Sequence, residues 1–301
     1  MLLKDILLLG FPENSELAKE VAELADTAYA DIQLHTFPDG ESKVTLPVQL
    51  PSHVILYRSL DHPNDKLVEL FLAAEGCRRQ GVEKLTLISP YLAYMRQDKA
   101  FNPGEVVSQK IIGELLAESF DGVLTVDSHL HRISQLSEAI PTEIAVNITA
   151  TEPMAYFLEN HFERPFLLGP DAESLQWVEA IAVHHQMDFA VANKERKGDK
   201  DVKISLPDAN FQGRNVVIVD DVASSGQTLI QAAQQLAELN ENMQPASVSV
   251  LVTHALFMNG AMRLLYDMGV SNIWSSNSIN HESNAVSLAT LLSKNLRQFI
   301  D

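Results

Sequence analysis

The stretch VVIVDDVASSGQT, from Val216 to Thr228, runs from four apolar residues directly into two adjacent aspartates and then into a loop of small and hydroxyl-bearing residues. A short apolar run bounded by polar residues is typical of a strand buried on both faces of a parallel sheet. The residues that follow, GQTLIQAAQQLAEL (226–239), have the apolar spacing of an amphipathic helix. The stretch therefore predicts a strand–loop–helix unit, and its loop falls at the carboxyl end of a strand, where parallel sheets bind ligands.

The same alternation of apolar strands and amphipathic helices continues along the whole chain of 301 residues. DILLLG (5–10) precedes the helical SELAKEVAELAD (15–26), and the chain ends in a helical pattern over 284–300. This rhythm predicts an α/β fold with mainly parallel sheets flanked by helices. Because the strands are too many for one ordinary sheet, we expect two domains, residues 1–145 and 146–301, with the last helix able to pack on the first domain. The boundary lies in PTEIAVNITATEP (141–153), which has prolines and no helical period.

Composition limits the classes of partner. A formal net charge of −18, from 22 basic and 40 acidic residues, argues against nucleic acid or an anionic membrane as the main partner. No apolar run is long enough to span a bilayer, and the N-terminal residues are typical of a first strand rather than a signal peptide. The single cysteine, Cys77, excludes an intrachain disulfide, so we expect a cytoplasmic protein with Cys77 buried as a packing residue.

The loop that follows Val219 suits a sugar phosphate. The hydroxyls and backbone N–H groups at the start of the predicted helix form a cradle for an anion, because the helix dipole favours negative charge there. The loop residues are Ser224, Ser225, Gly226, Gln227 and Thr228. Since two carboxylates cannot contact the same phosphate, Asp220 and Asp221 must face sugar hydroxyls or a cation. The alternative is an ordinary helix N-cap with solvated acids before it. Neither a Walker loop nor a dinucleotide fingerprint is present.

Three other segments place polar residues just beyond predicted strands. In SPYLAYMRQDK, Arg96 suits bidentate phosphate binding and is followed by Gln97. In VDSHLH, Asp127 and His129 have the chemistry to hold a metal ion or its water shell. In LGPDAESLQW, Asp171 is either a helix cap or a site residue. All three segments fall at strand ends, so they are candidates for one ligand site.

Two further segments are ambiguous when taken alone. Basic residues crowd NKERKGDK, at Lys194, Arg196, Lys197 and Lys200. That segment is either a solvated turn or a mobile basic loop that closes on a phosphoryl-transfer site. TFPDGESKV (36–44) contains PDG, an ordinary hairpin turn. Neither segment identifies a function without the others.

Taken together and in this order, FPDGE, RQDK, VDSH, GPD, NKERK and VVIVDDVASSGQT resemble the ribose-phosphate diphosphokinase family over nearly the whole chain. The last motif is similar to the loop of type I phosphoribosyltransferases, whereas RQDK with VDSH and FPDGE is more specific to the diphosphokinases. The resemblance implies two phosphoribosyltransferase-like domains. It also implies synthesis of 5-phosphoribosyl 1-diphosphate and AMP from ATP and ribose 5-phosphate.

The resemblance also implies where ATP binds. Arg96 and Gln97 would bind ATP, and Phe37, Asp39 and Glu41 would contact its adenine from a neighbouring subunit. We therefore expect a homodimer or a higher homo-oligomer with the ATP site at a subunit contact.

The remaining roles concern magnesium, the sugar and the transferring phosphates. His129 would hold the Mg²⁺ of Mg-ATP, and Asp171 would lie near the sugar hydroxyls and a second Mg²⁺. Asp220 and Asp221 would hold the ribose 2- and 3-hydroxyls, with the 5-phosphate on residues 224–228. The resemblance implies that Lys194 and Arg196 are the catalytic residues, on a flexible loop that stabilises the transferring phosphates.

Two other functions fit parts of the sequence. A phosphoribosyltransferase that consumes 5-phosphoribosyl 1-diphosphate needs the loop after Asp221 but leaves RQDK and VDSH without a role. A non-catalytic regulatory subunit would be favoured by loss of Lys194 or His129, and both are present. The residues after RQDK, AFNPGE, depart from those tied to phosphate and ADP regulation in many bacterial and animal members, so we expect no control of that kind.

Overall fold

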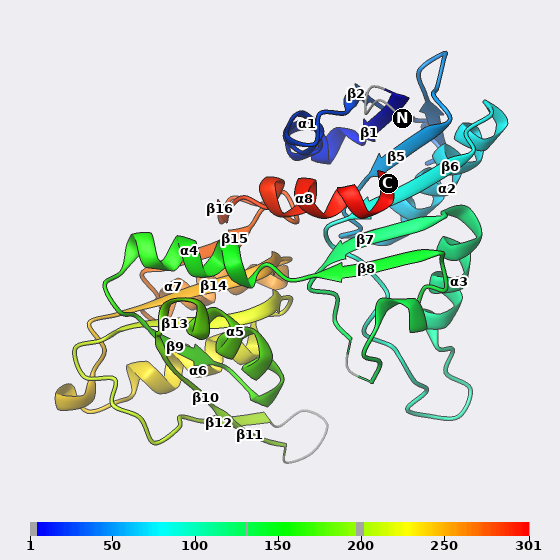
Figure 1. Ribbon diagram of the computed structural model, residues 1–301. Coiled ribbons are helices and arrows are strands. Elements are labelled where there is room, and N and C mark those ends of the chain that lie inside the picture. The colour runs from blue at the N-terminus through cyan, green and yellow to red at the C-terminus, as the bar shows by residue number, and fades with distance from the viewer. Residues whose placement is uncertain (1–4, 131, 197–201, 301) are drawn as a thin grey trace. The chain divides into compact units, whose positions relative to one another are not determined.

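The computed structural model describes residues 5–130, 132–196 and 202–300 (Figure 1). For residues 185, 194–196, 202 and 203 the description covers the backbone alone. The chain divides into two compact units, Met1–Thr149 with Leu288–Asp301, and Ala150–Ser287. The boundary that the sequence placed at 145/146 falls inside a strand, and the last helix belongs to the first unit.

The first unit is built on a six-stranded sheet with the order β2-β1-β5-β6-β7-β8, in which all neighbouring strands pair in parallel. Its strands are β1 (Ile6–Gly10), β2 (Ala28–Asp31), β5 (His53–Tyr57), β6 (Lys84–Ser89), β7 (Gly122–Val126) and β8 (Ile144–Ile148). Its helices are α1 (Ser15–Leu24), α2 (Pro63–Arg79), α3 (Ser108–Ser119) and α8 (Ala289–Ile300), with short turns η2 (Pro12–Asn14) and η3 (Leu136–Glu138). A separate antiparallel hairpin joins β3 (Gln33–Thr36) to β4 (Ser42–Thr45).

Helices cover both faces of this sheet because its strands are apolar on both sides. Val54 and Leu56 of β5 pack with α2 and α3 in one core, whereas α1 and α8 lie together on the opposite face (Figure 1). Phe299 of α8 fits against Gly122, where a Cβ atom would come within 2.7 Å of the ring. Cys77 is fully buried, and burial raises the pKa of its thiol to about 12. Its prediction as a packing residue is confirmed.

The second unit repeats this plan, with a sheet of order β10-β9-β13-β14-β15-β16 whose neighbours are all parallel. Its strands are β9 (Phe166–Gly169), β10 (Asp188–Val191), β13 (Asn215–Ala223), β14 (Ser247–Ala255), β15 (Asn272–Ser276) and β16 (Asn284–Val286). Its helices are α4 (Thr151–His161), α5 (Leu175–His185), α6 (Gln227–Ala237) and α7 (Ala261–Asp267), with turns η4 (Ala172–Ser174), η5 (Glu241–Met243) and η6 (Met258–Gly260). An antiparallel hairpin joins β11 (Asn193–Arg196) to β12 (Val202–Ser205).

The α/β prediction with two parallel-sheet domains is confirmed, and the local differences have simple causes. Residues 144–148 form β8 where the sequence placed the domain boundary, and this strand is the edge of its sheet, paired with β7. Residues 284–286 form β16 ahead of α8, so the final helix is shorter than its pattern predicted. Lys194 and Arg196 lie on a strand rather than in a loop.

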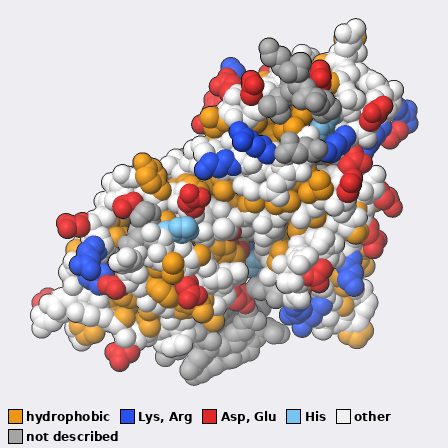
Figure 2. Space-filling view, viewed as in Figure 1, with side chains coloured by type: hydrophobic (Ala, Val, Ile, Leu, Met, Phe, Trp, Pro, Cys, Tyr) orange, Lys and Arg blue, Asp and Glu red, His pale blue; other side chains and the backbone are white. Residues whose placement is uncertain are grey.

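The Lys and Arg side chains drawn on the face seen in Figure 2 lie in separate small groups between acidic ones. Within the described ranges, no helix is both long enough and apolar enough to cross a membrane.

Candidate functional site

The carboxyl end of β13 gathers the acidic residues that the sequence singled out. The backbone N–H of Asp221 donates to Oδ1 of Asp220 over 3.0 Å, and the Asp221 side chain is buried. Burial first, and then the charges of Asp221 and Asp171, raise the pKa of Asp220 well above its usual range. Asp221 and Asp171 therefore both lie within electrostatic reach of Asp220, and a cation or hydroxyl donors would relieve the repulsion that Asp220 feels.

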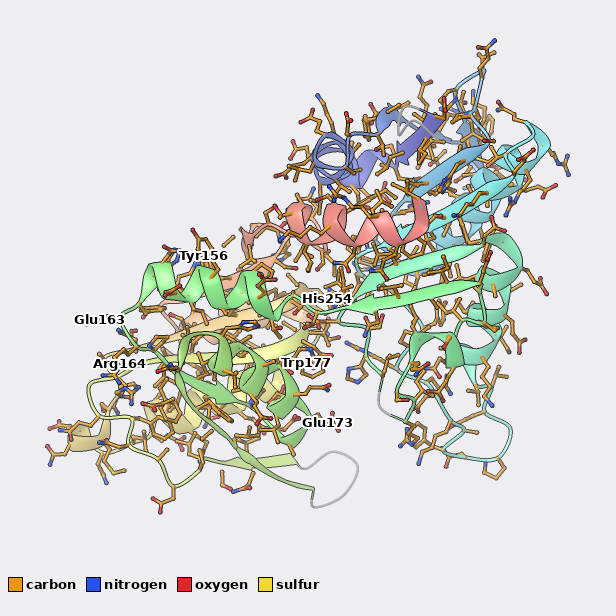
Figure 3. All side chains as sticks on the ribbon, viewed as in Figure 1. Tyr156, Glu163, Arg164, Glu173, Trp177 and His254 are labelled. Atoms are coloured by element: carbon orange, nitrogen blue, oxygen red, sulfur yellow. The ribbon has the colours of Figure 1, made fainter. Side chains whose placement is uncertain are left out.

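Asp171 reaches this cluster because β9, which precedes it, pairs with β13. Its Oδ1 accepts the backbone N–H of Glu173 over 3.0 Å, so it is the N-cap of η4, as one of the two sequence interpretations stated. The Ser174 hydroxyl donates to the Asp171 carbonyl oxygen over 2.6 Å, and Asp171 itself is buried. Glu173 and Trp177, labelled in Figure 3, mark the short η4–α5 segment that it caps. Capping and site roles are thus compatible for this residue.

The loop after Asp221 forms the start of α6. Gly226 has φ +68 and ψ 7, a left-handed conformation that glycine adopts without strain. A Cβ atom at Gly226 would lie 2.9 Å from the Cβ of Ala261, so the loop also approaches α7 closely. Ser225 and Gln227 are exposed, and Ser224 and Thr228 are partly so. Since the first N–H groups of a helix point out of its end, this geometry suits a phosphate.

A second loop supports the first, and the sequence analysis missed it. The backbone N–H of Phe257 donates to the Ala223 carbonyl over 2.7 Å, and that of Met258 donates to the Ser224 carbonyl over 2.8 Å. At the end of β14, the buried His254, labelled in Figure 3, pairs its Nδ1 with the Ser278 hydroxyl at 2.8 Å. THALF (253–257) gave no signal of this support, because the contacts of Phe257 and Met258 use backbone atoms.

In the first unit, the RQDK loop is held by α3. The backbone N–H of Gln109 donates to the Gln97 carbonyl over 3.3 Å, and the Ser108 hydroxyl donates to Oε1 of Gln97 over 3.2 Å. Arg96 is exposed, whereas the side chain of Asp98 is only 3% exposed. The loop thus presents Arg96 outward while Gln97 and Asp98 fix its shape.

An ion pair joins RQDK to the VDSHLHR segment. Nη1 of Arg132 donates to both carboxylate oxygens of Asp98, over 2.5 and 2.7 Å. Arg132 was missed in the sequence, where its only signal was its position next to VDSHLH. The ion pair brings two motifs together that lie 34 residues apart.

The turn after β7 carries His129. Asp127 is buried and has φ +40, and its backbone N–H donates to the Ile148 carbonyl over 2.8 Å. The backbone N–H of Ser128 donates to Oδ1 of Asn147 over 2.9 Å. A left-handed conformation costs a non-glycine residue roughly 1–2 kcal/mol, so bonds to β8 hold this turn in shape. His129 is half-buried beyond it.

The tip of the β3–β4 hairpin carries Phe37, Asp39 and Glu41, which are all exposed. The Phe37 N–H donates to the Glu41 carbonyl over 2.7 Å, and Oδ1 of Asp39 accepts the Glu41 N–H over 3.2 Å. The Phe37 ring is 41% exposed and lies edge-on to His35, with ring centroids 4.9 Å apart. PDG is thus a hairpin turn, as predicted, and part of the Phe37 ring beside it is accessible to a ligand or another chain.

The catalytic side chains expected at Lys194 and Arg196 lie outside the described part of the structure, as do Lys197 and Lys200. The backbone of the first two lies on β11, paired with β12. His129 belongs to the first unit and Asp171 to the second, so each candidate magnesium ligand is described within its own unit.

The donor set fits magnesium in its chemistry. Mg²⁺ prefers oxygen ligands and keeps several waters, so it needs only one or two carboxylates from a protein. Asp171 and Asp220 offer such oxygens at adjoining strand ends. Among the residues that the structure describes, no three His, Cys, Asp or Glu side chains form a metal cluster of their own. Any magnesium here would therefore share its coordination with water and substrate.

Comparisons with known proteins place this geometry in a family. The N-terminal domain of ribose phosphate pyrophosphokinase matches residues 6–119, and the phosphoribosyl transferase domain matches residues 145–289. The ribose-phosphate pyrophosphokinase of Saccharolobus solfataricus is 32% identical over 91% of this chain and 94% of its own. That of Methanopyrus kandleri is 29% identical over 94% of this chain and 96% of its own.

A solved structure shares the fold. The phosphoribosylpyrophosphate synthetase of Mycobacterium smegmatis superposes with a TM-score of 0.83, covering 99% of each chain at 20% identity. The fold likeness and the sequence relationship thus extend over both units.

Proposed function

The chain belongs to the ribose-phosphate pyrophosphokinase family, and on that premise we propose that it transfers the diphosphoryl group of ATP to ribose 5-phosphate. The oxygen of the sugar 1-hydroxyl attacks the β-phosphorus of ATP. The bond from that phosphorus to the oxygen bridging to the α-phosphate breaks, and the hydroxyl proton is released. The products are 5-phosphoribosyl 1-diphosphate and AMP.

The observation that carries the proposal is the end of β13, where carboxyl groups stand beside a helix-start loop. Asp220 and Asp221 offer oxygens that accept hydrogen bonds from the 2- and 3-hydroxyls of ribose. Residues 224–228 offer N–H groups and hydroxyls to the 5-phosphate. A sugar phosphate is the ligand class that uses both sets at once.

The ATP end of the reaction depends on basic side chains and on magnesium. Arg96, exposed beyond β6, and Gln97 bind the nucleotide, and Lys194 and Arg196 stabilise the charge on the transferring phosphates. His129 and Asp171 would hold Mg²⁺, which when bound neutralises charge on the phosphate oxygens. The work of these side chains is positioning and charge stabilisation, which dominate catalysis of phosphoryl transfer.

We further propose that the chain acts as a homodimer or a higher homo-oligomer. Phe37, Asp39 and Glu41 of one copy would contact the adenine bound by another copy. The exposure of the Phe37 ring at a hairpin tip supports this arrangement. A chain with one cysteine needs no oxidising compartment to fold, so the cytoplasm is the proposed site of action.

The test is an assay with ATP, Mg²⁺ and ribose 5-phosphate. We expect AMP and 5-phosphoribosyl 1-diphosphate in equal amounts. The phosphoribosyltransferase domain match gives the second unit a competing function, in which a nucleobase displaces pyrophosphate from 5-phosphoribosyl 1-diphosphate. Base-dependent release of pyrophosphate without formation of AMP from ATP would overturn the proposal.

A further inference from the structure

The β3–β4 hairpin is a sheet of its own, and one of its faces lies on α2. Leu34 and Val44 are paired across the hairpin and pack against the core of the first unit. Because side chains alternate between the faces of a strand, Ser42 lies on the same face as Val44. Ser42 pairs with Thr36 in the last rung of the ladder, directly before Phe37. Ser42 is therefore the inward-facing residue of β4 nearest the tip.

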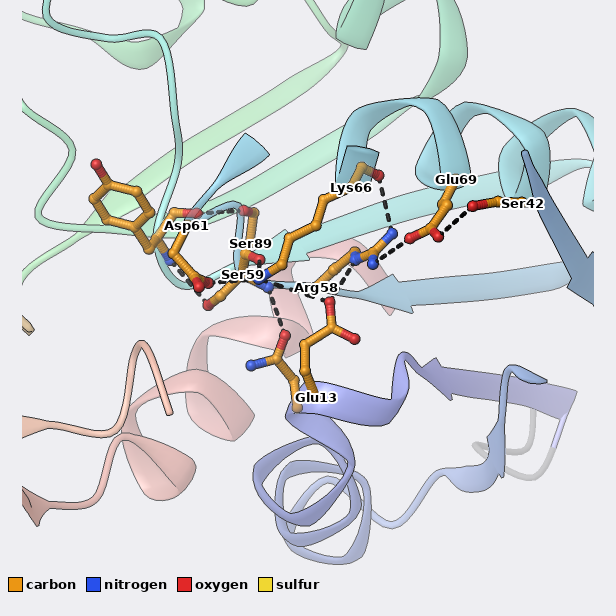
Figure 4. A network of polar contacts seen from close by, with 10 residues as sticks. Glu13, Ser42, Arg58, Ser59, Asp61, Lys66, Glu69 and Ser89 are labelled. Atoms are coloured by element: carbon orange, nitrogen blue, oxygen red, sulfur yellow. Dashed lines mark hydrogen bonds and ion pairs between the residues drawn. The ribbon is translucent and has the colours of Figure 1, made fainter. Parts of the chain in front are cut away.

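The Ser42 hydroxyl is hydrogen-bonded to a buried network of charged side chains (Figure 4). It donates to Oε1 of Glu69 over 2.7 Å, and Nη2 of Arg58 donates to Oε2 of Glu69 over 2.6 Å. The side chains of Arg58 and Glu69 are 3% and 9% exposed. Both oxygens of Glu69 are thus occupied, one by the hairpin and one by the end of β5.

Arg58, the partner of Glu69, is itself held by several other groups, so its side chain has little freedom to move. Its Nε donates to Oε1 of Glu13 over 2.7 Å, and its Nη1 donates to the Lys66 carbonyl over 2.9 Å. Its guanidinium also lies 4.0 Å from the centre of the Phe11 ring. A charge held by this many partners in a buried setting has little rotational freedom. Glu69 is therefore held in place by Arg58, and its hydrogen bond restrains Ser42 in turn.

We infer that Glu69 is a positioning residue for nucleotide binding, acting through Ser42 on the hairpin tip that carries Phe37, Asp39 and Glu41. The inference rests on the proposed function, in which that tip contacts adenine. A hairpin with exposed residues at its tip is mobile unless its last rung is anchored. When that rung is anchored, the tip loses less conformational entropy on binding a nucleotide, so the anchor favours binding of ATP.

The experiment compares two substitutions of equal shape at one position. Ser42→Val and Ser42→Thr differ by one hydroxyl, and both residues suit a strand. Glu69→Gln is tested beside them, and Phe37→Ala reports whether the tip contacts ATP. For each purified full-length variant, KM for ATP, KM for ribose 5-phosphate, kcat and the melting temperature are measured.

We expect Ser42→Val to raise KM for ATP roughly tenfold, since hydrogen bonds to charged groups are worth about that factor. Its KM for ribose 5-phosphate and its kcat stay within about twofold of wild type, and Ser42→Thr restores KM for ATP. We expect Glu69→Gln to raise KM for ATP at least as much, because its amide group cannot serve Ser42 and Arg58 as the carboxylate does.

Three results would overturn the inference. If Phe37→Ala raises KM for ATP while Ser42→Val does not, the tip binds nucleotide but needs no anchor, and the proposed function survives alone. If Ser42→Val raises both KM values together and lowers the melting temperature, the network only stabilises the fold. If Phe37→Ala changes nothing, the adenine role of the tip is wrong and the inference falls with it.

Discussion

Replacing Gly113 with alanine tests the packing that supports the RQDK loop. Gly113 lies within α3, where alanine would ordinarily stabilise a helix by about 1 kcal/mol. Here its Cβ atom would stand 1.8 Å from the backbone oxygen of Ala139. Ordinary contact begins at 3.4 Å, so α3 or the η3 turn must move by 3.4 − 1.8, or about 1.6 Å. Overpacking costs about 1–3 kcal/mol, and because a backbone oxygen cannot rotate away we take the upper part of that range, about 2–3 kcal/mol, which exceeds the gain in propensity.

We expect Gly113→Ala to lower the free energy of unfolding of the first unit by about 1–2 kcal/mol net. For a unit of this size that corresponds to a fall in melting temperature of about 2–8 °C. The same change should raise KM for ATP, because Ser108 and Gln109, one turn earlier in α3, hold Gln97. Urea and thermal unfolding followed by circular dichroism measure the first effect, and steady-state kinetics measure the second.

Gly76→Ala in α2 is the matched control. Its Cβ atom would also meet a close neighbour, at 2.9 Å, but that neighbour is the terminal methyl group of Leu46, which can rotate away. We expect the control to be neutral or to gain up to about 1 kcal/mol from helix propensity. The reasoning is refuted if Gly113→Ala proves as stable as wild type, or as stable as Gly76→Ala.

Three other perturbations test the site and the core. Burial and neighbouring carboxylates raise the pKa of Asp220 in the folded state, so the stability it contributes at low pH is lost as the pH rises through that pKa. Asp220→Asn should therefore raise the melting temperature at neutral pH while it lowers kcat/KM. A fall in both the melting temperature and kcat/KM would contradict this expectation. Lys194→Ala should reduce kcat by orders of magnitude with little change in unfolding, and near-normal turnover would exclude its catalytic role. Burial lowers the pKa of His53 from 6.5 to about 4, so stability is lost as the pH falls between these two values, with a slope approaching about 1.4 kcal/mol per pH unit. His53→Gln should flatten this part of the plot of unfolding free energy against pH. An unchanged acid side of that plot would contradict the expectation.

Much of the fold was predictable because the apolar and polar pattern of each strand–loop–helix unit lies in consecutive residues. Val216–Thr228 predicted a buried strand, a loop with carboxylates and a helix start. β13 and α6 follow that order, but the strand continues through Asp220 and Asp221 to Ala223, so the two carboxylates lie on β13 rather than in the loop. The pattern failed at β8 and β16, edge strands of five and three residues that are too short to establish a period. Such strands are recognised only by their pairing with a neighbouring strand, here β7 for β8 and β15 for β16.

The candidate site was predictable only where the chemistry lies in consecutive residues. The Asp98–Arg132 ion pair, the backbone bonds of Phe257 and the bond from Ser42 to Glu69 each join segments that the sequence keeps apart. Asn14 illustrates the same limit. It is the N-cap residue of α1, a position that favours asparagine because the side chain can bond the helix start, yet its side-chain oxygen accepts the backbone N–H of Ser59 over 2.9 Å. The local sequence predicts which residue stands at the start of the helix, but the tertiary structure determines its hydrogen-bond partner.

The two sheets share one strand order, with a hairpin after the second strand of each unit, so their strands can be matched one to one. In this correspondence β5 is the counterpart of β13, and Arg58 stands where the second unit carries Asp220. At this strand end the second unit carries carboxyl groups, whereas the first unit carries a guanidinium that is ion-paired with Glu13 and Glu69. The same place in the fold is thus a candidate ligand site in one unit and an internal ion-pair network in the other.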